Sequence, residues 1–84
     1  MNKRKLLLKA YNGPNNLRFH EFVELIEAFG FQFQRTRGSH HLFAKPGLSS
    51  IVNVQEHAGK AKPYQVRQFL ELIERYELEF GEAS

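Results

Sequence analysis

The feature that most constrains the fold is a series of three short strand-like segments joined by very short connections. Residues 31–35 and 51–55 alternate apolar and polar side chains as half-buried strands do, and residues 40–45 form a further strand between them. The connections, residues 36–39 and 46–49, contain the Gly, Ser and Pro residues that are typical of turns. Parallel pairing needs a crossover of about a dozen residues, so the three segments predict an antiparallel meander.

Two amphipathic helices are predicted on either side of these strands. Residues 17–29 and residues 64–77 repeat apolar side chains at spacings of three and four, which is the period of one helix face. Gly30 suits a left-handed C-cap directly after the first helix, and Pro63 suits the first turn of the second. Residues 3–10 are compatible with a short additional helix at the N-terminus.

The predicted order is therefore α-β-β-β-α, which defines an α+β fold. A three-stranded antiparallel sheet of this kind buries one face under the two helices and leaves the other face open to solvent or a ligand. With 84 residues, of which 42% are hydrophobic, the chain has the size of a single small domain that extends over residues 1–84 and has a thin core.

Composition excludes several kinds of protein. The sequence has no cysteine, so disulfides and thiolate zinc sites are excluded. No apolar run approaches the roughly 18–20 residues of a membrane span. The apolar stretch near the N-terminus, residues 6–8, is shorter than the core of a signal peptide, which has about 7–15 residues. We therefore expect a cytoplasmic protein with no membrane contact.

The net charge of +3 is unevenly distributed along the chain. Glutamates concentrate in the two predicted helices, whereas residues 28–70 contain six cations, three histidines and a single acid, Glu56. This pattern is typical of a face that binds phosphate, although an unevenly charged solvated surface has the same composition.

His57 lies in a predicted loop, residues 57–63, and is a candidate acid or an ordinary loop residue. The candidate RNA contacts are Arg35, Arg37, Ser39, Lys45, His57, Lys60 and Lys62.

The adjacent histidines His40 and His41 are the main candidates for catalysis. Adjacent strand residues point to opposite faces, so the two imidazoles cannot share one metal ion, and neither a metal site nor a cofactor is predicted. RNA cleavage needs no metal when an imidazole accepts the 2′-hydroxyl proton while cations stabilise the phosphorane. Arg35 and Arg37 directly before the pair supply such cations. The alternative is that both histidines are partly exposed polar residues of a strand.

The sequence leaves open which of the two histidines faces a ligand. His40 shares a strand face with Leu42, whereas His41 shares the opposite face with Phe43. If the leucine side packs on the helices, His41 faces solvent. If Phe43 packs on the helices, His40 faces solvent.

Two stretches of the chain resemble a known family. Residues 30–47, GFQFQRTRGSHHLFAKPG, resemble the core of the HicA toxin family, in which a GF-type strand and a basic turn precede a G-S-H motif. Residues 51–78, with N-x-Q and GKAKPYQVRQFL, resemble one branch of that family. Many members end the third strand with Pro-x-His, where this chain has Gln55-Glu56-His57. The similarity extends over residues 3–78.

This resemblance implies a fold like that of double-stranded-RNA-binding domains. It also implies an mRNA interferase of a type II HicAB toxin–antitoxin system, that is, a metal-independent endoribonuclease whose HicB antitoxin masks the active histidine. The histidine of the G-S-H motif corresponds to His40, so His40 is the first candidate for catalysis and His41 the second. The alternative is a non-catalytic module of the same fold that binds RNA or the antitoxin partner.

Overall fold

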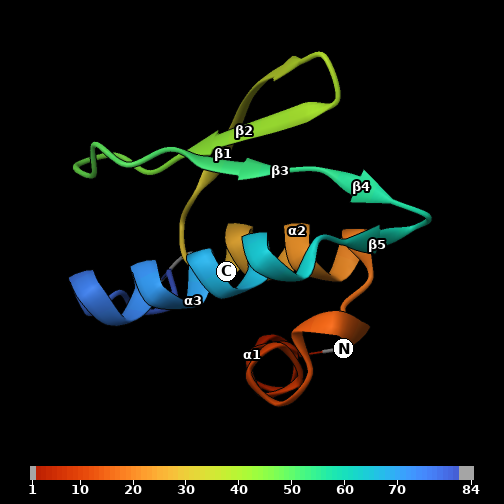
Figure 1. Cartoon of the computed structure of the whole chain (residues 1–84). Helices are drawn as coiled ribbons and strands as arrows, with labels where there is room; N and C mark the ends of the chain where they lie inside the picture. The colour runs from red at the N-terminus through yellow and green to blue at the C-terminus, as the bar shows by residue number, and fades with distance from the viewer. Residues whose placement is uncertain (1, 82–84) are drawn as a thin grey trace.

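The computed structural model describes residues 2–81 and confirms the predicted α+β fold (Figure 1). Strand β2 pairs antiparallel with both β1 and β3, whereas β4 and β5 form a separate two-stranded ribbon. The elements in chain order are α1 (Lys3–Asn12), a 3-10 turn η1 (Pro14–Asn16), α2 (Phe19–Ala28), β1 (Gln32–Arg37), β2 (His40–Ala44), β3 (Val52–Val54), β4 (Glu56–His57), β5 (Lys60–Ala61) and α3 (Pro63–Tyr76).

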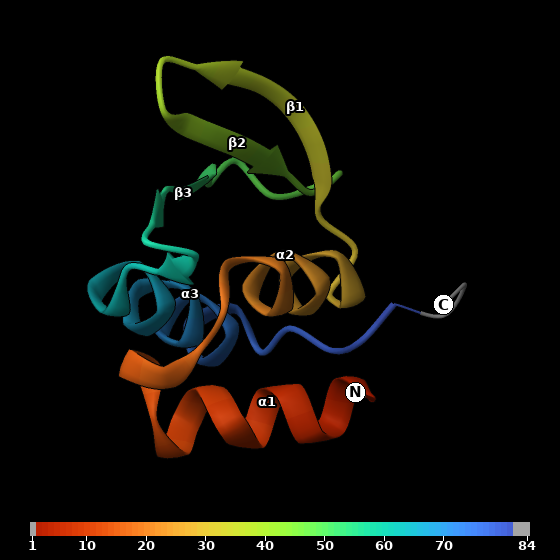
Figure 2. The same ribbon diagram turned by 90° about the vertical axis from the view of Figure 1, so that its right-hand side faces the viewer.

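The elements form three layers, namely the β1-β2-β3 sheet, the pair α2 and α3, and α1 on the far side of that pair (Figure 2). The core extends from the sheet through α2 and α3 to Leu6 and Ala10 of α1, and Phe69 of α3 contacts three other rings within it. The ring of Phe69 meets those of Phe22, Phe29 and Phe31 edge to face, at centroid distances of 5.9, 5.8 and 5.6 Å. Each such aromatic pair adds about 0.5–1.5 kcal/mol beyond the burial of its area. Within residues 2–81, no helix lies on the opposite face of the sheet (Figure 2).

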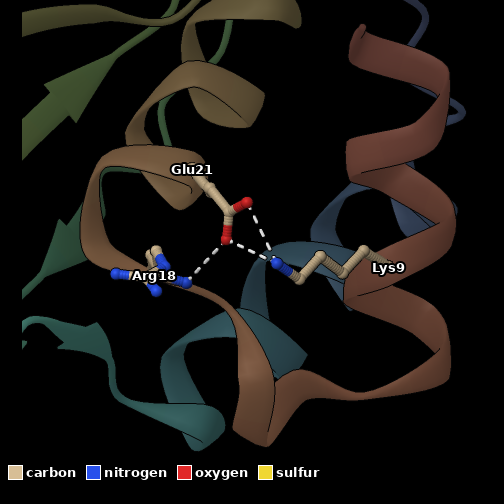
Figure 3. Close-up of polar contacts among 3 residues, drawn as sticks. All are labelled: Lys9, Arg18 and Glu21. Atoms are coloured by element: carbon tan, nitrogen blue, oxygen red, sulfur yellow. Dashed lines mark hydrogen bonds and ion pairs between the residues drawn. The ribbon is translucent and has the colours of Figure 1, made fainter. Parts of the chain in front are cut away.

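An ion pair joins α1 to the start of α2 (Figure 3). Lys9 Nζ donates to both carboxylate oxygens of Glu21 at 2.8 and 3.0 Å, and the backbone N–H of Arg18 donates to Glu21 Oε1 at 2.9 Å. The hydrogen bond from Lys9 lowers the pKa of the Glu21 carboxyl, with help from the Arg18 N–H, although burial acts in the opposite direction. Helical periodicity puts Glu21 on the polar face of α2, but the residue is only 8% exposed because Lys9 of α1 covers it.

Strand β1 is longer than its pattern predicts and contains a bulge. Thr36 and Arg37, expected in the turn, pair with β2, and only Gly38 and Ser39 connect the two strands. Gly38 has φ +62°, and a positive φ at the first central residue is what a tight two-residue hairpin turn requires. The register shifts at Gln34, which is the extra residue of a β-bulge.

The segment expected as a loop, residues 57–63, contributes to a short hairpin and to the start of α3. Its strands are only two residues each, so no alternation of side chains marks them. The hairpin is held by the residues that precede and begin α2, since Ala61 N–H donates to Leu17 O and Phe19 N–H donates to Gly59 O, both at 3.0 Å. Tertiary contact with a distant segment therefore orders this part of the chain.

Candidate functional site

The burial of Phe43 decides which face of β2 each histidine occupies. Phe43 is 3% exposed and lies in the core, so His41 is on the helix side of the sheet and His40 on the open side. The ring of His41 lies 5.2 Å from that of Phe19, the first residue of α2. Its Nδ1 atom is buried and has no hydrogen-bond partner among the described residues. His41 therefore packs between the sheet and α2.

His40 is held by a hydrogen bond to the neighbouring strand. Its Nδ1 atom lies 2.8 Å from Oδ1 of Asn53 in β3. An amide oxygen only accepts, so Nδ1 is the donor in this contact, and in the neutral form of the ring the lone pair is on Nε2. The imidazole is half-buried, which leaves part of the ring open to solvent on the uncovered face. The contact with Asn53 thus occupies one ring nitrogen and leaves the other available to a ligand.

The bulge at Gln34 puts Arg35 and Arg37 on the same sheet face as His40. Arg35 pairs with Leu42 and Arg37 pairs with His40, and paired residues of an antiparallel ladder share a face. Phe33 is on the helix side, because it pairs with the buried Phe43. If β1 alternated strictly, both arginines would be on that side as well. Both arginines are exposed, and neither forms an ion pair within residues 2–81. The open face therefore presents two free cations beside an imidazole.

Asn53 and Gln55 are site residues that the sequence-based candidates omit. Asn53 orients His40, and the side-chain amide of Gln55 donates to Ser39 Oγ at 3.1 Å. Gln65 in turn accepts from the backbone N–H of Gln55 at 2.8 Å, and it is only 4% exposed although its helix position suggests a surface residue. The alternation with valines does indicate that Asn53 and Gln55 point away from the core. Nothing local to the sequence distinguishes them from ordinary solvated residues.

Lys45 is not on the open face with the arginines. Its Nζ donates to the carbonyl of Phe29 at 2.8 Å, at the C-terminus of α2. The ammonium group of Lys45 also lies close to the backbone of Gly30, which has a φ of +89°. A Cβ added at Gly30 would be 2.6 Å from Lys45 Nζ. Lys45 therefore stabilises the end of a helix through the carbonyl of Phe29, and its role as an RNA contact stays a prediction.

The remaining candidates lie on and after the β4–β5 hairpin. His57 and Lys60 are directly opposite each other, and Lys62 directly precedes α3. The hairpin is at the same end of the molecule as the turn between β1 and β2 (Figures 1 and 2). The structure thus separates the candidates into an open-face group around His40 and a hairpin group around His57.

Neither a metal cluster nor a membrane span is found in residues 2–81. No three residues of the types His, Cys, Asp and Glu lie together in a way that could hold a metal ion within that range. None of the helices that the structure describes is both long and apolar enough to cross a bilayer.

Comparison with known proteins places this chain in a family. Comparisons with curated proteins and with solved structures give no match. A family model described as HicA toxin of bacterial toxin–antitoxin matches residues 19–74, two thirds of the chain. The match includes β1, β2 and β3, which carry the arginines, His40 and Asn53. From a match of this length, the chain belongs to the HicA toxin family.

Proposed function

We propose that this HicA-family protein cleaves mRNA as a metal-independent endoribonuclease, with His40 as the group that transfers protons. The observation that carries this proposal is the 2.8 Å contact between His40 Nδ1 and Asn53 Oδ1, which in the neutral imidazole favours the tautomer with the lone pair on Nε2. A base held in position by a third group is the arrangement that activates hydroxyl nucleophiles in enzymes. An amide in that position also fixes the tautomer without adding a charge.

In the proposed reaction, Nε2 of His40 accepts the proton of a ribose 2′-hydroxyl. The 2′-oxygen attacks the adjacent phosphorus, the bond from phosphorus to the 5′-oxygen breaks, and a 2′,3′-cyclic phosphate forms. The 5′-oxygen takes a proton from the imidazolium or from water, so the step balances without a metal or a cofactor. A positioned acid or base of this kind contributes about 100- to 10,000-fold to the rate.

Arg35 and Arg37 are the proposed phosphate ligands at this site. Guanidinium groups bind phosphate oxygens through paired hydrogen bonds, and two of them beside the base stabilise the negative charge of the phosphorane. Ser39 lies in the turn between Arg37 and His40, with its Oγ already hydrogen-bonded to Gln55. We assign it a role in shaping the turn that carries His40.

His41 is the second choice for catalysis, and its packing supports a structural role instead. Its ring lies against Phe19 on the helix side of the sheet, and its Nδ1 is buried. A substrate on the open face reaches His40 but is separated from His41 by the sheet. We therefore propose that His41 supports the contact between β2 and α2.

The family implies a cognate antitoxin for this chain. We propose a HicB-type antitoxin that covers the open face of the sheet and thereby blocks access to His40. Its surface is expected to be acidic where it meets Arg35 and Arg37, because complementary charge speeds association. We also propose a cytoplasmic location, because mRNA is present there. Residues 1–84 form one domain in this proposal.

Cleavage of labelled RNA in the presence of EDTA tests the proposed activity. The variants are His40→Ala, His41→Ala and, as a matched control, His20→Ala, which removes an exposed histidine from α2. We expect wild type and His20→Ala to cleave and to leave a cyclic phosphate, whereas His40→Ala is slowed about 100-fold or more. His41→Ala is expected to unfold at a lower temperature but to cleave while it is folded.

Two outcomes contradict this assignment. If wild type binds RNA in EDTA but does not cleave it, the protein is the non-catalytic module. If folded His41→Ala is inactive while His40→Ala cleaves normally, the base is His41 and the packing argument is wrong.

A further inference from the structure

A hollow of about 530 Å³ lies beside the β4–β5 hairpin, away from the imidazole of His40. We propose that it binds one unpaired nucleotide of the RNA substrate, with the base stacked on Tyr64 and the phosphate held by the lysines at its rim. This inference rests on the proposed function and adds a substrate class, single-stranded RNA, to it. The lining residues are Asn15, His57, Ala58, Lys60, Ala61, Lys62, Pro63 and Tyr64.

The chemistry of the lining matches the two halves of a nucleotide. Ala58, Ala61, Pro63 and the ring of Tyr64 supply apolar surface, and no carboxylate is among the lining residues. Tyr64 is 48% exposed, so about half of this residue is accessible to a ligand. The cationic and polar residues of the lining supply hydrogen-bond donors for an anion. Sites for small ligands have volumes of roughly 300–1,000 Å³, mostly apolar walls and a few polar groups.

The walls of the hollow are fixed before any ligand arrives. Two backbone hydrogen bonds, Ala61 N–H to Leu17 O and Phe19 N–H to Gly59 O, join the hairpin to the residues at the start of α2. Pro63 begins α3 with a restricted φ, and Tyr64 is the next residue of that helix. A preformed site loses little conformational entropy on binding.

The hollow is within reach of a strand that is bound at His40. Val54 pairs directly with His41, the neighbour of His40. His57 follows Val54 by three residues, so its Cα lies at most about 11 Å from that of Val54. One single strand can therefore occupy both places with a few nucleotides between them. A base inside a duplex is stacked and paired, so it cannot enter such a hollow without being extruded.

Binding of fluorescein-labelled RNA by the full chain tests this subsite. The background is His40→Ala, which keeps the substrate intact, and anisotropy is measured for one sequence as a single strand and as a duplex. We expect Tyr64→Ala to weaken binding of the single strand about fivefold or more and Tyr64→Phe to retain it. Tyr76→Ala is the matched control, since Tyr76 is 45% exposed at the other end of α3 and is expected to change nothing.

The outcomes separate the subsite from the proposed activity. Equal affinities for the single strand in Tyr64→Ala and Tyr76→Ala overturn the subsite, provided that circular dichroism shows both variants folded. An equal loss for single strand and duplex in Tyr64→Ala also overturns it, because the effect then does not depend on an unpaired base. Cleavage of RNA by wild type in EDTA is measured in parallel. If wild type cleaves RNA and Tyr64→Ala binds it normally, the subsite is rejected and the proposed activity is retained.

Discussion

Two single-residue deletions in β1 test whether Arg35 binds RNA from the sheet face that carries His40. Gln34 is the extra residue, and beyond it Arg35 and Arg37 pair with residues of the open face. Deletion of Gln34 removes the bulge and keeps both pairs, so both arginines stay on the face of His40. Deletion of Thr36 shortens β1 equally but shifts Arg35 by one position, which turns its side chain to the helix side.

The two deletions differ by one phosphate contact if Arg35 binds RNA. Each contact with a single strand contributes about 0.7 to the slope of log K against log salt concentration, so the Thr36 deletion lowers that slope by about 0.7. A hydrogen bond to a charged group contributes about 1.5–3 kcal/mol, so affinity falls about tenfold or more relative to the Gln34 deletion.

Anisotropy titrations between roughly 50 and 200 mM salt, in the His40→Ala background, measure both quantities. Thermal unfolding followed by circular dichroism establishes that both deletion variants are folded. Equal slopes and equal affinities for two folded variants would refute the role given to Arg35 on the open face.

Three further predictions concern stability, measured by urea unfolding. Because Lys9 lowers the pKa of Glu21 below its ordinary 4.5, this pair stabilises the fold fully above that pH and less as pH falls through the lower native pKa. Lys9→Met is expected to cost about 1–3 kcal/mol at pH 7 and to flatten this pH dependence, and an unchanged dependence contradicts the pairing. Gly30→Ala is expected to cost about 1–3 kcal/mol chiefly through its positive φ, because the flexible Lys45 side chain can move aside, and a smaller cost contradicts the left-handed backbone at this position. Phe69→Ala is expected to cost about 3–5 kcal/mol, and a loss below 1 kcal/mol contradicts its ring contacts in the core.

The sequence alone predicted the main helices and the meander. Residues 17–29 and 64–77 were expected as helices, and α2 and α3 occupy Phe19–Ala28 and Pro63–Tyr76. The three strands were expected with short antiparallel connections, and β2 pairs with both of its neighbours as expected. Such elements are predictable because a buried face repeats with the period of its own helix or strand.

The partners of buried polar groups were not predictable in this way. Glu21 and Gln65 look like surface residues of their helices, yet Lys9 covers the first and Gln55 binds the second. The β4–β5 hairpin likewise depends on backbone bonds to the residues around the start of α2. These contacts join segments that are far apart in the sequence, so no local pattern contains them.

The G-S-H motif and its resemblance to HicA toxins already identified the candidate histidines. Which histidine faces the open side depended on Phe43, because one aromatic side chain in the core sets the orientation of the whole of β2. The bulge at Gln34 then brought the arginines to the same side, and Asn53 on the next strand fixed the imidazole. Sequence therefore determined which side chains are present along each strand. Only tertiary structure decided which of them share a face, since register and burial depend on pairing between strands and on packing against the helices.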